Sequence, residues 1–193
     1  MISEPVPQAI SQLKLRYAFL QHNPPILTCI DSSTDANTMV IDDEELFYSH
    51  FTDQEDQENR CVIVNNVEGH EIFLLAIDNK FISNYPGGIA DCALFDESLF
   101  NFVEFKTNAE GHTTAQVEET YRNAMAQIDN TYRLFKTKLS EVGVDFVKVV
   151  NIQCYIVVSS RFPRESAIEQ QLQAEFAQSL HLDLSFENVI EFK

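Results

Sequence analysis

One stretch of 21 residues, 87–107, constrains the fold of this chain more than any other: GGIADCALFDESLFNFVEFKT. It holds two short apolar segments, 90–95 and 100–106, separated by an acidic turn, which is typical of two antiparallel strands in a hairpin. Side chains of a strand alternate between its two faces, so Glu104 and Lys106 project from the same face. Pairing of the two strands brings Asp91 alongside them. We therefore expect two carboxylates and one ammonium on a single patch of sheet.

The segments around this hairpin predict a mixed sheet. Apolar residues recur at helical spacing in residues 7–22, 113–143 and 165–180. The longest of these helices begins with Thr113 and Gln116, a capping box, and ends at Gly143. Further strands are expected at 26–30, 61–64, 72–77, 149–159 and 182–192, with 61–64 and 72–77 forming a hairpin and 182–192 an edge strand. This order implies an α/β (α+β) domain spanning 1–193, a mixed sheet flanked by helices on both sides.

Residues 42–58 carry eight acidic side chains and no Lys or Arg. We interpret them as an acidic insertion in which Leu46, Phe47 and Phe51 anchor a short helix and the remainder is a solvated loop. The more specific interpretation is that the same residues form a docking surface for a basic partner.

The net charge of −17, with only 13 Lys and Arg, argues against tight and unaided binding of nucleic acid. No apolar run approaches the length of a membrane helix, and the first residues lack the pattern of a signal peptide, so we expect a cytoplasmic protein. The four cysteines, Cys29, Cys61, Cys92 and Cys154, are far apart in apolar segments, which favours buried free thiols over structural zinc.

An acidic residue two positions before a lysine occurs three times, at Asp78/Lys80, Glu104/Lys106 and Glu191/Lys193. Only the second pair has an aspartate on an upstream strand and a long capped helix after it. Two carboxylates about 4 Å apart at a partly buried site repel by roughly 4 kcal/mol at an effective dielectric of 20. A divalent cation relieves that repulsion, and hard oxygen ligands suit Mg²⁺ or Mn²⁺.

Two short motifs, Gly88-Ile89-Ala90-Asp91 and Phe102-Val103-Glu104-Phe105-Lys106-Thr107, resemble the PD-(D/E)XK nuclease superfamily in its RecB-type form. The resemblance covers about residues 60–160 and implies a restriction-endonuclease-like core. It implies that Asp91 and Glu104 bind Mg²⁺ or Mn²⁺ and that Lys106 is the catalytic lysine. Gln127 matches a helix glutamine that many members carry, and Thr131 stands where the RecB-type pattern places a tyrosine.

We therefore expect a metal-dependent nuclease that hydrolyses phosphodiester bonds of nucleic acid, DNA rather than RNA, with a basic partner helping to hold the substrate. The alternative is a catalytically silent nuclease-like fold that acts as an acidic interaction module, antitoxin-like or mimicking nucleic acid. A hydrolase of small phosphate esters, or a surface salt-bridged trio without function, also fits the three charges. Glu44, Glu45 and His112 are further candidates for the site.

Overall fold

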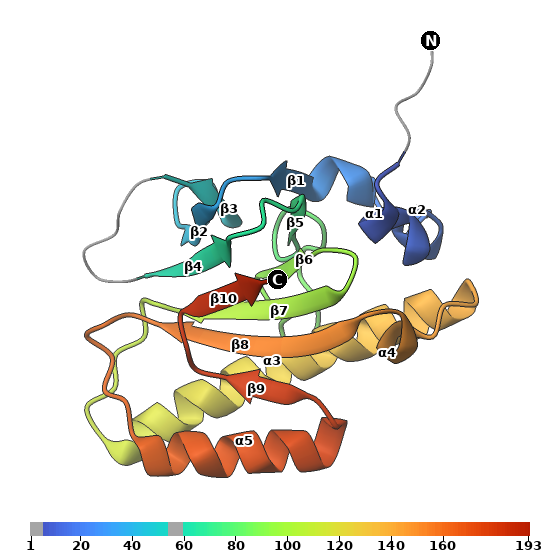
Figure 1. Cartoon of the computed structure of the whole chain (residues 1–193). Coiled ribbons are helices and arrows are strands. Elements are labelled where there is room, and N and C mark those ends of the chain that lie inside the picture. The colour runs from blue at the N-terminus through green and yellow to red at the C-terminus, as the bar shows by residue number, and fades with distance from the viewer. Residues whose placement is uncertain (1–5, 54–59) are drawn as a thin grey trace.

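The computed structural model describes residues 6–53 and 60–193, which form two mixed β-sheets and a set of helices (Figure 1). Sheet A has the strand order β1-β5-β6-β7-β8-β9, and sheet B has the order β10-β4-β2-β3. In sheet A, β1, β5, β6 and β7 are antiparallel neighbours, whereas β8 and β9 continue the sheet in parallel with β7. In sheet B, β2 pairs antiparallel with β3 and β4, and β10 runs parallel to β4.

The strands are β1 (Ile30–Ser33), β2 (Asn37–Asp43), β3 (Tyr48–Thr52), β4 (Cys61–Asn66), β5 (Ile72–Ala76), β6 (Cys92–Phe95), β7 (Leu99–Lys106), β8 (Asn151–Val158), β9 (Asp183–Ser185) and β10 (Val189–Phe192). The helices are α1 (Gln8–Gln12), α2 (Leu15–Ala18), α3 (Thr114–Glu141), α4 (Phe146–Val149) and α5 (Ser166–Leu180), with a 3₁₀ turn over Ile26–Cys29. None of the helices in the described ranges is both long and apolar enough to cross a membrane.

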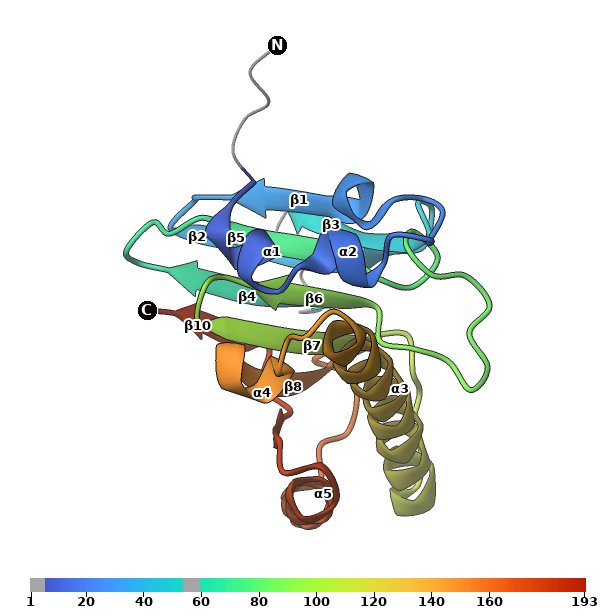
Figure 2. The same cartoon turned by 90° about the vertical axis from the view of Figure 1, so that its right-hand side faces the viewer.

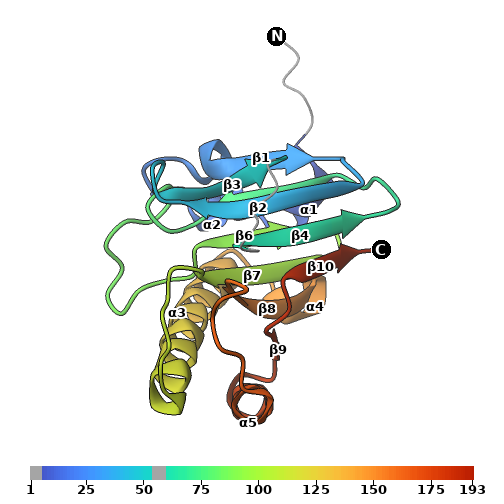
Figure 3. The ribbon, with the colours of Figure 1, turned by 90° about the vertical axis from the view of Figure 1, so that its left-hand side faces the viewer.

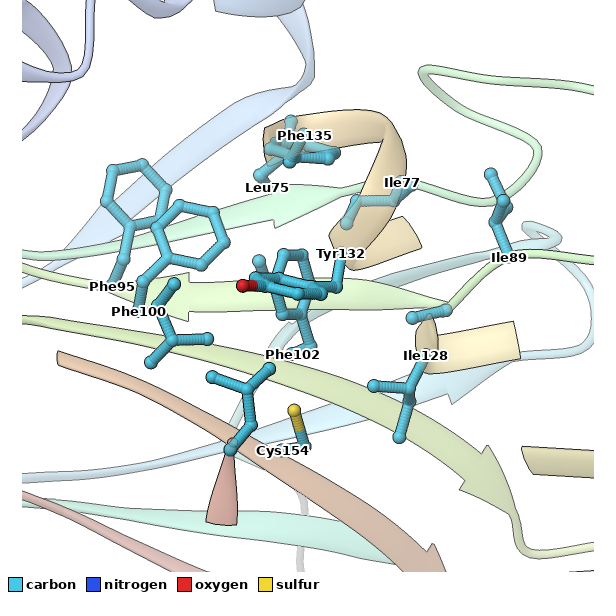
Figure 4. Close-up of a cluster of buried hydrophobic side chains, with 14 of the residues drawn as sticks. Leu75, Ile77, Ile89, Phe95, Phe100, Phe102, Ile128, Tyr132, Phe135 and Cys154 are labelled. Carbon is cyan, nitrogen blue, oxygen red and sulfur yellow. The ribbon is translucent and has the colours of Figure 1, made fainter. Parts of the chain in front are cut away.

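The two faces of sheet A are covered by different kinds of structure. One face carries Phe95, Phe100 and Phe102, which pack with Tyr132 and Phe135 of α3 in the larger core cluster, together with buried residues of the other helices (Figure 4). The opposite face packs on sheet B in a second cluster. Figure 2 views the side with α1, α2 and α4 in front, and Figure 3, from the opposite side, has β2, β4 and β10 in front.

The α+β class is therefore confirmed, but the expectation of helices on both sides of the sheet is wrong. Residues that we expected in an acidic insertion, 42–52, complete a β-hairpin of sheet B. Its turn is fixed by Asp43, whose Oδ1 accepts the backbone N–H groups of Glu45 (2.7 Å) and Leu46 (2.9 Å). Phe51 packs against the core between the sheets, so it does not anchor a helix. Residues 54–58 of the predicted insertion lie outside the described residues.

Four further expectations differ from the structure. The strand expected at 26–30 is a 3₁₀ turn over Ile26–Cys29, and β1 begins only at Ile30. The predicted first helix is broken at Lys14, which has a left-handed backbone (φ of 50°) and separates α1 from α2. Strands β4 and β5 belong to different sheets, so the predicted hairpin of 61–64 with 72–77 is wrong. The segment 182–192 forms two strands, β9 in sheet A and β10 in sheet B, because the chain crosses between the sheets after Ser185.

The features that position the predicted site are confirmed. Strands β6 and β7 pair antiparallel, with Cys92 opposite Val103. Helix α3 begins at the Thr113 cap, where the hydroxyl oxygen accepts the backbone N–H of Gln116 at 3.3 Å. The cysteines Cys29, Cys61, Cys92 and Cys154 are buried free thiols, as expected.

Candidate functional site

Glu104, Lys106 and Gln127 form one contact group between β7 and α3. Glu104 and Lys106 share with Phe102 the face of β7 that is covered by helices, since strand side chains alternate. The Lys106 ammonium Nζ donates to Glu104 Oε1 at 2.5 Å and to Gln127 Oε1 at 2.7 Å. Gln127 Nε2 in turn donates to the carbonyl of Ile89 at 3.3 Å. The lysine is thus held between an acid on its own strand and an amide on the covering helix.

Asp91 joins this group from the residue directly before β6. Its Oδ2 accepts the backbone N–H of Phe105 at 2.5 Å, which places the carboxylate beside the Glu104–Lys106 segment of β7. Its backbone carbonyl accepts the N–H groups of Ile77 (2.8 Å) and Asp78 (3.1 Å) at the end of β5. The structure therefore brings together all four residues that the sequence motifs single out.

The Glu104 carboxylate is almost fully buried, with 1% of the residue exposed. Within the described part of the chain, its Oε2 atom has no hydrogen-bond partner, while Oε1 has the Lys106 ammonium. A buried carboxylate oxygen without a partner is costly, because it has lost its hydration. Glu104 thus has one oxygen on the lysine and a second oxygen that is buried without a partner.

Burial raises the pKa of Glu104 to about 7, against the opposing effect of the Lys106 charge, and the charges of Asp78 and Asp42 add to the increase. The pKa of Asp91 is also raised well above its usual value, first by burial and then by the negative charge of Glu104. Burial and neighbouring negative charges therefore make it more costly to ionise either carboxylate. A cation bound between them removes this penalty.

Asp42 and Asp78 are parts of this electrostatic site that sequence reasoning missed. Asp42 lies near the end of β2 in sheet B, two residues after the buried Val40, and Asp78 follows β5, the neighbour of β6. Their charges raise the pKa of Glu104, and burial together with the charge of Asp78 raises the pKa of Asp42. Asp78 stands directly after the buried apolar run 72–77, a position that could have identified it.

The loop before Asp91 is fastened to α3 by contacts that the motifs did not predict. Asn130 Nδ2 donates to the carbonyls of Gly87 (3.2 Å) and Gly88 (2.9 Å). The hydroxyl oxygen of Thr131 accepts the backbone N–H of Ala90 at 2.7 Å, and the same hydroxyl donates to a backbone carbonyl one turn earlier in α3. This buried threonine occupies the position where the RecB-type pattern places a tyrosine.

Gly88 is the closest point of approach between the loop and the glutamine. Its φ is +77°, and a Cβ at this position would lie 2.9 Å from Cγ of Gln127. Only glycine adopts this conformation without strain and leaves room for the amide. The Gly-Gly pair therefore permits the contact that positions Gln127 and, through it, Lys106.

The remaining candidates make contacts of a different kind. Glu44 accepts a hydrogen bond from the Asn108 side chain, which links the β2–β3 turn to the loop after β7. Glu45 lies exposed in that turn. His112 lies in the loop before α3, where its Nε2 is 3.7 Å from Glu110 and its backbone N–H donates to Gln116. The contacts of His112 are thus with its loop neighbours.

A metal ion at this site would draw on two protein carboxylates. Across residues 6–53 and 60–193, no set of three or more His, Cys, Asp or Glu side chains is arranged to hold a metal ion. Mg²⁺ commonly binds through one or two carboxylates and completes its octahedron with water and substrate phosphate. The unpartnered Oε2 of Glu104 and the carboxylate of Asp91 fit this mode of binding.

Comparison of the chain with protein-family models, with curated proteins and with solved structures gives no match.

Proposed function

We propose that this protein is a Mg²⁺- or Mn²⁺-dependent nuclease of the PD-(D/E)XK type that hydrolyses phosphodiester bonds of nucleic acid. The observation that carries the proposal is the state of Glu104: a buried carboxylate with one oxygen on Lys106 and the other without a partner. A structural ion pair would satisfy both oxygens, whereas a metal ligand needs one of them free.

In this proposal, Asp91 and Glu104 hold the metal ion. A bound divalent ion polarises a phosphoryl oxygen and lowers the pKa of a bound water molecule. Burial and neighbouring negative charges raise the pKa of both carboxylates, so a bound cation would offset part of the cost of ionising them. The proposed metal thus compensates the same charges that make the site costly without it.

Lys106 acts on the substrate and the attacking water. An ammonium group has three N–H donors, of which the contacts to Glu104 and Gln127 use two. The third donor can orient the water or bind the charge that develops on the phosphate. Gln127 is a positioning residue, because its amide fixes the lysine from the opposite side.

The proposal is tested by incubating the purified chain with single- and double-stranded DNA and RNA in Mg²⁺ or Mn²⁺. Lys106→Ala is expected to lower the cleavage rate by about 10²–10³-fold, the usual cost of losing one donor that stabilises developing charge. The matched control is Lys193→Ala, which removes the lysine of another acid-x-Lys pair, an exposed one with 2.6 Å between Lys193 Nζ and Glu191. Equal activity of both variants, or a wild type that cleaves none of these substrates, contradicts the proposal.

The alternative function, an acidic interaction module, is favoured by one specific feature of the surface. Leu46 and Phe47 are 49% and 69% exposed at the turn between β2 and β3, next to Glu44 and Glu45. Apolar side chains within an acidic turn suit contact with a basic protein partner. If this is the function, replacing both with Ser abolishes partner binding while Lys106→Ala does not, and the reverse pattern supports the nuclease.

A further inference from the structure

The turn between β2 and β3, residues 44–47, carries a side chain that neither packing nor the backbone favours there. Phe47 is 69% exposed, so its ring buries little apolar surface. Its φ is 61°, in the left-handed region where a bulky side chain is strained. Folding alone would favour glycine or a small polar residue at this position. A strained and exposed aromatic residue therefore points to a role in binding.

Hydrogen bonds hold the backbone of this turn in one conformation. The N–H of Phe47 donates to the carbonyl of Asp43 at 2.7 Å. One oxygen of the Asp43 carboxylate accepts the N–H groups of Glu45 and Leu46, and the other lies 3.1 Å from Nε2 of His50. A ligand that binds to Phe47 therefore does not have to order the turn first, which lowers the entropic cost of binding.

Three residues of the proposed active site and its surroundings lie along one edge of sheet A. In the antiparallel pairing of β5 with β6 and of β6 with β7, the end of β5, the start of β6 and the end of β7 meet at this edge. They carry Asp78, Asp91 and Lys106 in that order. The charge of Asp42, at the end of β2, raises the pKa of Asp91, so the β2–β3 turn begins next to the same edge.

The β2–β3 turn is fastened to both ends of this edge. On the β7 side, Glu44 accepts a hydrogen bond from the side chain of Asn108 in the loop that follows β7. On the β5 side, the ammonium of Lys80 lies over the ring of Tyr48, with 4.3 Å from Nζ to the centroid. Figure 3 shows the turn and the loop after β7 at the same end of the molecule. The turn that carries Phe47 therefore borders the proposed site.

The tip of the turn lies within a short length of nucleic acid from the site. Ser49 Oγ donates to Asp42 Oδ1 at 3.3 Å, which closes the hairpin next to the site. The tip begins about two residues beyond this pair, or roughly 7 Å at about 3.3 Å per residue. At about 3.4 Å per phosphate of one strand, this corresponds to roughly two phosphates.

The chemistry of the turn suits a base better than a phosphate. Glu44 and Glu45 are exposed in it and repel phosphate groups, but a nucleobase is uncharged. Every base has a π-face, and stacking of bases on aromatic side chains is a common means of binding single strands. A base that is paired and stacked in a duplex is not available for such a contact.

We propose that Phe47 is a substrate-binding residue that stacks on an unpaired base close to the phosphodiester held at Glu104 and Lys106. This inference rests on the proposed nuclease function and names single-stranded nucleic acid as its substrate class. The exposed side chains of the turn also underlie the alternative function, contact with a protein, so the test has to show dependence on the base.

The test measures binding of two fluorescein-labelled 20-mers by anisotropy, oligo(dT) and an abasic strand of tetrahydrofuran phosphates. The parent is Lys106→Ala in Mn²⁺, so that cleavage is slow. Adding Phe47→Ala is expected to weaken binding of oligo(dT) about fivefold or more and to leave binding of the abasic strand unchanged. Phe47→Trp should keep the affinity for oligo(dT). The matched control is Leu20→Ala, which removes an equally exposed apolar side chain (69%) after α2 and should change neither affinity.

Two further readouts separate base stacking from a structural role of Phe47. The chain contains no tryptophan, so Phe47→Trp introduces a single indole, whose fluorescence oligo(dT) should quench and the abasic strand should not. Leu20→Trp should show no quenching. Phe47→Gly relieves the backbone strain, so we expect a higher urea midpoint together with weaker binding of oligo(dT). A lower urea midpoint with unchanged binding indicates a structural role and overturns the inference.

Cleavage by the wild type separates this inference from the proposed function. If the Phe47→Ala form binds oligo(dT) as tightly as its parent, or if the parent does not bind it, the inference is overturned, while cleavage by the wild type leaves the nuclease proposal standing. Binding that depends on Phe47 and on the bases, without cleavage by the wild type, supports the base contact and contradicts the nuclease. A wild-type dimer that Phe47→Ala cannot form overturns the inference, because a second copy then covers the ring.

Discussion

The variant Glu104→Gln tests whether ionisation of the Glu104 carboxylate destabilises the folded protein. In the folded protein the pKa of Glu104 is about 7, compared with an ordinary value of 4.5, and burial is the main cause. Between these two pH values the folded state binds more protons than the unfolded state. The free energy of unfolding therefore falls as the pH rises through this window, and the full penalty is present above the folded pKa.

The size of this penalty follows from the shift. At about 1.36 kcal/mol per pH unit, raising the pKa from 4.5 to about 7 costs the metal-free protein about 3 kcal/mol at pH 8. Gln cannot ionise, so the variant lacks this contribution, and it also lacks the negative charge that raises the pKa of Asp91, which changes the difference in the same direction. Relative to wild type, Glu104→Gln should gain about 3 kcal/mol between pH 4 and pH 8.

The measurement is urea unfolding of both proteins in EDTA at pH 4 and pH 8, with equal m-values as the check on two-state behaviour. Saturating Mn²⁺ at pH 8 should then stabilise wild type, by about 2.7 kcal/mol at 100 times its dissociation constant, and leave the variant unchanged. A pH-dependent difference below about 1 kcal/mol refutes the reasoning, because it means that Glu104 ionises at no cost.

Two further predictions concern the fastening of the glycine loop to α3. Gly88→Ala should lower the free energy of unfolding by at least about 1 kcal/mol more than Gly143→Ala. Both glycines have positive φ, but only a Cβ at Gly88 meets Gln127, which holds Lys106. Equal losses in chemical unfolding contradict this. Thr131→Val leaves the buried N–H of Ala90 without its acceptor and should cost about 1–3 kcal/mol, whereas Thr137→Val on the exposed face of the same helix should be close to neutral. A neutral Thr131→Val would show that this hydrogen bond contributes nothing.

Local sequence patterns were sufficient to predict the elements around the site. The capping box at Thr113 and a stripe of seven apolar residues at helical spacing predict α3. All seven are buried: Val117, Tyr121, Ala124, Ile128, Tyr132, Phe135 and Leu139. Alternation along β7 places Glu104 and Lys106 on one face, and the short acidic turn predicts the pairing of β6 with β7. These inferences succeed because each depends on neighbours in the sequence.

The second sheet could not be predicted in the same way. A period of two shows which side chains share a face, but it does not show which sheet a strand joins. The segment 182–192 illustrates this, because its first strand extends sheet A and its second pairs with β4 in sheet B. The acidic residues near Asp43 suggested a solvated loop, although their strands bury Val40 and partly bury Phe51 between the two sheets.

At the site, the motifs identified the charged residues but not the residues that support them. Asn130 and Thr131 matter because the 87–90 loop lies against α3, a contact between segments about forty residues apart. Asp42 reaches the electrostatic environment of the site from the other sheet. Such relations arise from tertiary structure, so no local pattern in this chain could show them.

The central claim is that Asp91 and Glu104 bind a divalent metal ion, and a crystal soaked in Mn²⁺ tests it most directly. The account predicts an anomalous peak at about 2.1 Å, a typical metal–oxygen distance, from Glu104 Oε2 and from a carboxylate oxygen of Asp91. The same soak of Glu104→Gln crystals should give no peak there. Wild-type crystals without Mn²⁺ between these two carboxylates at saturating concentration and pH 8 would contradict the account.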